Sequence, residues 1–179
     1  SDKLFKKAYG SRSTAALHTT TFGGIGTTCE VAIESLKIIS DELFLKDVKS
    51  KGKYFLDQLV VLQNEFPNKI KKILGKGLFL GVELIFPVEI PKNNFNNKII
   101  KTRDQLFIAS LMNNLYKEHN ILCSFAPSSP EVLDICPPLI IDYEDIDYFI
   151  KSLKSVLKKN YIQLTKDLAK NLIWENDYP

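Results

Sequence analysis

The spacing of apolar residues predicts two helices in the first third of the chain. Apolar positions recur at helical spacing after Thr27, which stands three residues before Glu30 as in a capping box. A second helix is expected over about residues 43–65, although Gly52 interrupts its pattern. The first helix has an apolar face of Val31, Ile33, Leu36, Ile38 and Ile39. The residues of the second helix expected to point inward are Leu43, Val48, Phe55, Leu56, Leu59, Val60 and Leu62.

The pattern changes from helical to extended in the middle of the chain. The stretch "GKGLFLGVELIF", residues 75–86, begins with Gly-Lys-Gly, which predicts a turn, and the apolar run after it stops before Pro87, so it predicts a short strand. A polar loop follows at 91–98, and a helix is expected from about Thr102 to Lys117. The inward residues of this helix are predicted to be Leu106, Phe107, Ile108, Leu111 and Leu115.

The last part of the chain predicts a strand pair and further helices. The runs "ILCSFA" and "EVLDICP" flank "PSSP", residues 127–130, which has the length of a hairpin loop. A helix capped by Asp142 should follow, because Asp145 stands three residues on. Its inward residues are predicted to be Ile146, Phe149, Ile150, Leu153, Val156 and Leu157, and a last helical stretch includes Leu164, Leu168, Leu172 and Trp174.

This order of elements predicts an α+β fold with a small, mostly antiparallel sheet and helices packed on one face. The composition limits the classes of binding partner that are expected. Of the 24 basic residues only Arg12 and Arg103 are arginine, and the lysines are scattered, so no nucleic-acid partner is expected. No apolar run is long enough to span a membrane. The three widely spaced cysteines and two histidines predict reduced, partly buried thiols and no metal site, and the default location is cytoplasmic.

The stretch "HTTTFGGIGTTCE", residues 18–30, carries candidate chemistry. Glycines precede a predicted helix start, where unpaired amides and the helix dipole favour an anion, and Thr19, Thr20 and Thr21 add hydroxyl donors. The same residues are also compatible with a helix-capping loop after an extended segment. Composition alone leaves both interpretations open.

Three motifs in order, "HTTTFGG", "GKGLFLGVEL" and "VLDICPPLIID", resemble the C-terminal part of class III aminotransferases, pyridoxal-phosphate (PLP) enzymes of fold type I. The resemblance covers about residues 4–157. It implies that Thr20 and Thr21 bind the PLP phosphate in the other subunit of a homodimer. It also implies that residues 1–41 end the large PLP-binding domain, that 42–159 form the small α+β domain, and that 160–179 are a terminal helical extension.

One departure from the family pattern concerns the substrate. Asp134 stands where the family carries an arginine that in many members binds a substrate α-carboxylate. An aspartate repels a carboxylate and attracts an ammonium group. We therefore hypothesise a substrate-binding role for Asp134 in an enzyme that acts on an amine, diamine or aldehyde. The alternative, that Asp134 is a solvated strand residue, stays open.

A second departure concerns catalysis. The resemblance places the family's Schiff-base lysine before Ser1, so no catalytic residue is assigned on this chain. We expect the C-terminal portion of a PLP-dependent aminotransferase, inactive alone. The whole enzyme would transfer an amino group from an amine, diamine or amino acid to an aldehyde or keto acceptor. A non-catalytic binding or assembly domain of α+β type is the alternative.

Overall fold

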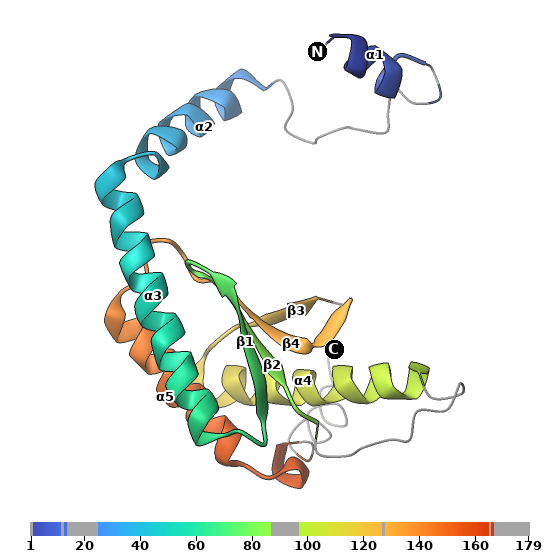
Figure 1. Ribbon diagram of the computed structural model, residues 1–179, viewed down its shortest axis with the longest axis vertical. Coiled ribbons are helices and arrows are strands. Elements are labelled where there is room, and N and C mark those ends of the chain that lie inside the picture. The colour runs from blue at the N-terminus through green and yellow to red at the C-terminus, as the bar shows by residue number, and fades with distance from the viewer. Residues whose placement is uncertain are drawn as a thin grey trace, which may run out of the picture. The chain divides into compact units, whose positions relative to one another are not determined.

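The computed structural model describes residues 2–11, 13, 25–86, 97–126, 128–164 and 166. The chain divides into two compact units, Ser1–Leu45 and Lys46–Pro179. The first unit contains α1 (Asp2–Tyr9), α2 (Gly26–Ile39) and the start of α3 (Glu42–Glu65), and Figure 1 labels every element. The second unit holds the rest of α3 and all the described strands.

Helix α2 presents the expected apolar residues without burying them. None of its residues is buried, and Val31, Leu36 and Ile38 are 67%, 56% and 61% exposed. The predicted capping box is wrong, because the helix already begins at Gly26 with Ile25 as the N-cap residue and no side-chain capping bond. Ile25 offers no side-chain acceptor, and Thr27 lies inside the first turn, where it cannot act as the N-cap.

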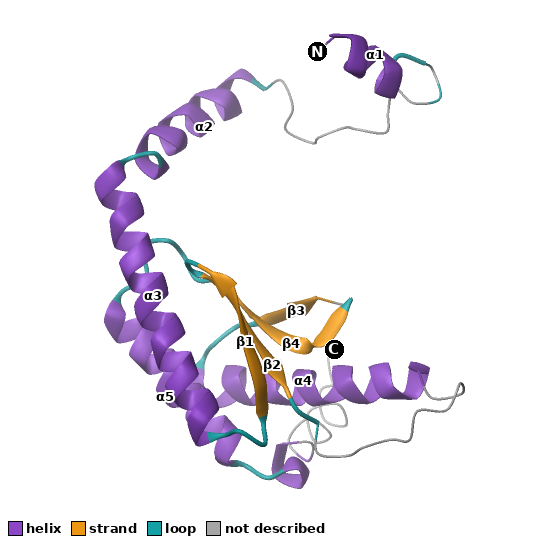
Figure 2. Ribbon diagram, in the orientation of Figure 1, coloured by secondary structure: helices purple, strands orange, loops and turns teal. Residues whose placement is uncertain are grey.

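The second unit contains a four-stranded sheet made of β1 (Ile70–Lys76), β2 (Phe79–Leu84), β3 (Ser124–Ala126) and β4 (Ser129–Ile135). The strand order is β1-β2-β4-β3, and every pair of neighbours is antiparallel (Figure 2). This confirms the predicted α+β fold with a small antiparallel sheet. The hairpin is also confirmed, but its loop is shorter than predicted, because Ser129 and Pro130 already belong to β4.

Strand β1 was not predicted from the sequence pattern. Two adjacent lysines, Lys71 and Lys72, interrupt the alternation, and the register against β2 shifts between Ile70 and Lys72. The turn predicted at Gly75–Gly77 falls on the end of β1 and the turn after it, and the strand predicted after that turn is β2. Gly75 and Gly77 both have positive φ, +113° and +59°, which glycine adopts at little cost.

Helices α3, α4 (Asn97–His119) and α5 (Tyr143–Lys158) share one hydrophobic core with the sheet. The strands alternate, so that Leu80, Val82 and Leu84 of β2 and Leu133 and Ile135 of β4 are buried in this core. The helices contribute Phe55, Leu59, Leu62, Phe107, Ile108, Leu111, Leu115, Ile146, Phe149, Leu153, Val156 and Leu157.

Most of the predicted inward positions are confirmed, and three are wrong. Leu43, Val60 and Leu106 are 76%, 41% and 49% exposed. Helical spacing identifies a stripe of apolar residues, but these three lie beyond the part of the stripe that the sheet and the other helices cover. Asp142 is the N-cap residue of α5 as predicted, although its side chain makes no capping hydrogen bond.

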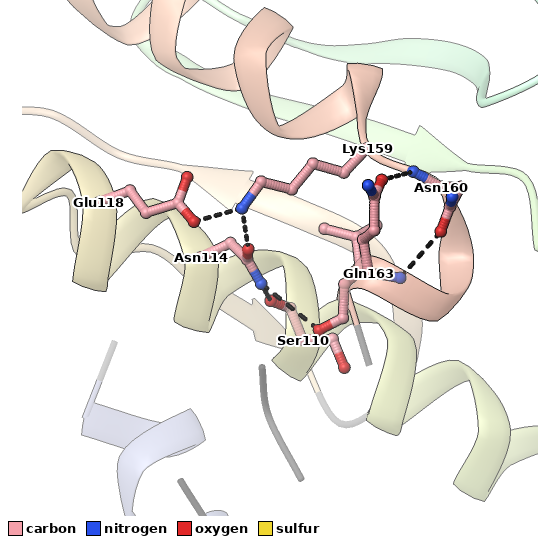
Figure 3. Close-up of polar contacts among 7 residues, drawn as sticks. Ser110, Asn114, Glu118, Lys159, Asn160 and Gln163 are labelled. Carbon is pink, nitrogen blue, oxygen red and sulfur yellow. Dashed lines mark hydrogen bonds and ion pairs between the residues drawn. The ribbon is translucent and has the colours of Figure 1, made fainter. Parts of the chain in front are cut away.

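A buried polar network fixes α4 to the segment after α5. Asn114 is 1% exposed, and its Nδ2 donates to the Ser110 carbonyl at 2.8 Å and to the Leu164 carbonyl at 3.5 Å. Lys159 Nζ donates to Asn114 Oδ1 at 2.6 Å and also to the Glu118 carboxylate (Figure 3). The network satisfies a buried amide that would otherwise destabilise the helix pair.

The chain just after this network is also helical. Residues 161–164 form one turn, which Asn160 and Gln163 cap reciprocally (Figure 3). Leu164 is buried, as the predicted terminal helix requires. Leu168, Leu172 and Trp174, the other residues predicted for that helix, lie outside the described residues.

Candidate functional site

The predicted phosphate-binding residues Thr20 and Thr21 lie outside the described residues. The neighbouring part that the structure does describe is the start of α2 at Gly26. The phosphate contact therefore stays a prediction.

Asp134 is positioned by the central strand pair of the sheet. Its cross-strand neighbours are Gly81 on β2 and Ser124 on β3. It alternates with Leu133 and Ile135, which face the core, so the pleat places it on the other face of the sheet. Gly81 has no side chain, and Val132 of β4 fills the space beside it, because a Cβ added at Gly81 would lie 2.9 Å from Val132 Cγ1.

The carboxylate of Asp134 makes no ion pair or hydrogen bond with another described residue. Glu83, two residues along β2 from Gly81, differs in this respect, because its Oε1 lies 2.5 Å from Lys71 Nζ. Among the described residues, Asp134 thus carries a negative charge without an ion-pair partner, on a partly exposed side chain. Such a charge is available for a cationic ligand.

A cavity of about 430 Å³ lies beside Asp134, at the end of the β3–β4 pair. Its wall comes from residues 120–123, residues 134–138, the first turns of α5 and Phe55 of α3. Asp145 of α5 contributes a second carboxylate, and the lining contains no lysine, arginine or histidine. The charge of the described lining is therefore negative at neutral pH.

Two thiols line the same cavity. Burial raises the pKa of Cys123 to about 11. Burial also raises the pKa of Cys136, and the nearby charge of Asp134 adds to this effect. Both groups are therefore protonated at neutral pH, and neither is an activated nucleophile. The predicted partial burial holds for Cys123 but is wrong for Cys29 and Cys136, which are exposed.

Sequence reasoning singled out Asp134 but missed the place of Asp145 in this cavity. Asp145 was predicted only to support the start of a helix, and it does lie in the first turn of α5. No linear spacing rule relates it to Asp134, because the end of a strand and the start of the following helix meet only through packing. Within the described part of the chain, no cluster of histidine, cysteine and carboxylate side chains could hold a metal ion. No described helix is long and apolar enough to cross a membrane.

Comparison with known proteins identifies the family. The class-III aminotransferase family model matches residues 3–157. A probable mitochondrial acetylornithine aminotransferase of Dictyostelium discoideum is 33% identical over 143 residues, which are 79% of this chain and 26% of that protein. An ornithine aminotransferase of Halalkalibacterium halodurans is 32% identical over 141 residues, 79% of this chain and 29% of that protein.

The solved structures agree with the curated relatives. An aminotransferase of Bacillus anthracis matches with a TM-score of 0.59 and 28% identity, over 87% of this chain and 34% of that one. The chain thus spans less than a third of the length of each of these two curated relatives. The matched range includes the strand with "GKGLFLGVEL" and the strand that carries Asp134. The chain belongs to the class-III aminotransferase family.

Proposed function

We propose that this chain is the C-terminal portion of a PLP-dependent aminotransferase. The enzyme would transfer an amino group from an amine, diamine or amino acid to an aldehyde or keto acceptor. The observation that carries the proposal is the family match over residues 3–157, which includes three motifs in the family order. We also propose that residues 1–41 end a large domain, that residues 42–159 form a small domain, and that residues 160–179 form an extension.

The cavity beside Asp134 does not fit the phosphate of the cofactor. The cavity beside Asp134 is lined by two carboxylates and by no basic side chain, so it repels a phosphate. We assign the phosphate contact to Thr20 and Thr21, whose hydroxyls and backbone amides can donate to phosphate oxygens. In a homodimer these residues would serve the site of the other subunit. When bound, PLP supplies the electron sink for amino transfer.

Two lysines of the second unit, Lys51 and Lys69, are engaged by other residues of the chain, which supports the proposal that the catalytic lysine is not one of them. Lys51 is 9% exposed, but its Nζ lies 2.8 Å from Asp47 Oδ2, and this contact raises its pKa. Burial lowers the pKa of Lys69, yet its Nζ donates to the carbonyls of Leu157 and Lys159 at the end of α5. A lysine that holds PLP would need a free amine that loses its proton readily. We therefore expect no turnover from these residues alone.

Asp134 is proposed to bind substrate in place of the family arginine. An unpaired carboxylate attracts the ammonium group of an amine or diamine and repels an α-carboxylate. The enzyme is therefore expected to prefer amino donors that lack an α-carboxylate.

Absorption spectroscopy with added PLP tests the assignment of the catalytic lysine. We expect no aldimine that borohydride reduces at one defined lysine when PLP is added to the 179-residue chain. A protein that also contains the preceding domain should form one and should transaminate. A single reducible lysine within this chain would contradict the assignment. Absence of PLP binding in the longer protein would favour a non-catalytic module.

Amino-donor preference tests the role of Asp134. In the longer protein, Asp134→Arg should shift relative kcat/KM from amines toward α-amino acids. Glu131→Gln, on the same strand, is the matched control and should leave the preference unchanged. An unchanged preference in Asp134→Arg would show that the carboxylate does not contact the donor.

A further inference from the structure

We propose that the cavity beside Asp134 binds an organic ammonium ligand that has an apolar body, with Asp134 and Asp145 both facing its charge. The inference deepens the role proposed above for Asp134 and rests on it. It adds a second carboxylate, from another element of the fold, and it specifies the kind of group that accompanies the ammonium.

The charge balance of the cavity is the first argument. Asp134 and Asp145 both line it, and neither makes an ion pair or hydrogen bond with another described residue. Because Cys123 and Cys136 have raised pKa values, the thiols add no charge at neutral pH. Two unpaired carboxylates that share one concavity are stabilised by a cation placed between them.

The apolar part of the wall is the second argument. Phe55 of α3 and Phe149 of α5 line the cavity from the core side, where they are 1% and 8% exposed, and their rings meet edge to face with centroids 5.4 Å apart. Ile121, Ile135 and Ile141 complete an aliphatic surface around them. A ligand that fills this space must therefore bring apolar area, which a simple inorganic cation lacks.

Tyr148 supplies the third argument. Its hydroxyl donates to the His119 carbonyl at 3.0 Å, so this hydroxyl is already engaged within the protein. Tyr148 is also one of the residues that line the cavity. An aromatic ring in that position favours a cation through its electron-rich face. The ring of Tyr148 and the carboxylates of Asp134 and Asp145 therefore all favour a positively charged ligand.

The volume limits the ligand to a small molecule. About 430 Å³ lies within the usual range of small-molecule sites, and the cavity walls come from one compact unit. A ligand such as phenethylammonium, with one ammonium group and one aromatic body, matches both the charge and the size. A peptide or protein segment would need an extended groove.

Isothermal titration of the 179-residue chain, without PLP, tests this inference with three probes of matched size. Phenethylammonium is expected to bind with a dissociation constant on the order of millimolar. The neutral 2-phenylethanol and the anionic 3-phenylpropanoate should bind at least about fivefold more weakly. Equal affinity for the ammonium and the alcohol would overturn the proposal, and so would the absence of ammonium binding.

Three variants locate the site. Asp134→Asn and Asp145→Asn should each weaken phenethylammonium binding by about fivefold, while the affinity for 2-phenylethanol stays unchanged. Glu144→Gln is the matched control, because Glu144 lies in the same first turn of α5 but does not line the cavity. Glu144→Gln should bind phenethylammonium with the same affinity as the wild type. If Glu144→Gln weakened phenethylammonium binding as much as Asp145→Asn does, the negative charge at the start of α5 as a whole would explain the effect. That result would overturn the proposed site.

The result separates this inference from the proposed enzyme function. Binding is measured without PLP and without turnover, so an inactive chain does not affect the readout. If the ammonium binds but Asp134→Arg leaves donor preference unchanged, the cavity is a ligand site that the reaction does not use. If donor preference changes without ammonium binding by the chain, the cavity assignment fails and the role of Asp134 stands. Circular dichroism of each variant confirms that the fold is retained.

Discussion

Gly52 in helix α3 lies directly against Gly77 in the turn between β1 and β2. A Cβ atom added at Gly52 would lie 2.6 Å from the carbonyl carbon of Gly77 and 2.7 Å from its oxygen. Contacts this short with backbone atoms do not occur for real side chains, and a backbone cannot rotate away as a side chain does. The glycine that interrupts the helical pattern therefore allows the helix to approach the turn closely.

Gly52→Ala is expected to destabilise the protein despite the higher helix propensity of alanine. Overpacking against the turn should cost about 1–3 kcal/mol, more than the ~1 kcal/mol that alanine gains in a helix. Urea unfolding measures the difference. Gly26→Ala is the matched control, since a Cβ at Gly26 meets nothing within 4 Å, and it should be neutral or slightly stabilising. A Gly52→Ala protein as stable as the wild type would contradict the close contact.

The buried thiol of Cys123 should make stability depend on pH in the alkaline range. Its pKa is about 11 in the folded protein against an ordinary value of 9.0, so the folded state favours the neutral thiol. This contribution is fully present below about pH 9 and is lost as the pH rises toward 11.

The measurement for Cys123 is the free energy of unfolding of wild type and Cys123→Ala between pH 8 and about 11. Groups other than Cys123 titrate alike in both proteins, so the wild type should lose stability relative to the variant as the pH rises. Cys29→Ala, at an exposed cysteine, should show a constant difference. A constant difference for Cys123→Ala as well would mean that the thiol is not buried.

The contact between Asn114 and Lys159 should be measurable as an energetic coupling. Asn114→Ala removes hydrogen bonds of a buried amide and should cost about 1–3 kcal/mol. A double-mutant cycle with Lys159→Met should give a coupling of about 0.5–3 kcal/mol. Lys158→Met, at an exposed neighbour, is the control and should not couple to Asn114→Ala. Additive effects of the first pair would contradict the network.

The exposed apolar residues of α2 should promote self-association of the chain. Val31 and Ile38 are both more than half exposed and stand two turns apart on the same side of the helix. Size-exclusion chromatography with light scattering should show species larger than a monomer, and Val31→Gln with Ile38→Gln should shift them toward a monomer. Glu34→Gln on the same helix should have no effect. A wild-type chain that is monomeric throughout would refute this expectation.

The sequence by itself predicted the elements whose signals are local. Helical spacing identified α4 and α5 and nearly all their buried residues, and Asp142 was placed correctly at the start of α5. The hairpin of β3 and β4 followed from two apolar runs around a short loop. Each of these signals depends on residues a few positions apart, where backbone geometry alone fixes which side chains share a face.

The tertiary structure decided everything that depends on residues far apart in the chain. Strand β1 was missed because paired lysines and a register shift hide its alternation, and pairing with β2 stabilises it. Gly52 could be understood only once Gly77 was found against it. Asp145 joins Asp134 at one cavity through the packing of a helix on a sheet. The chain order contains no spacing rule for such contacts, because long-range packing, rather than local geometry, brings these residues together.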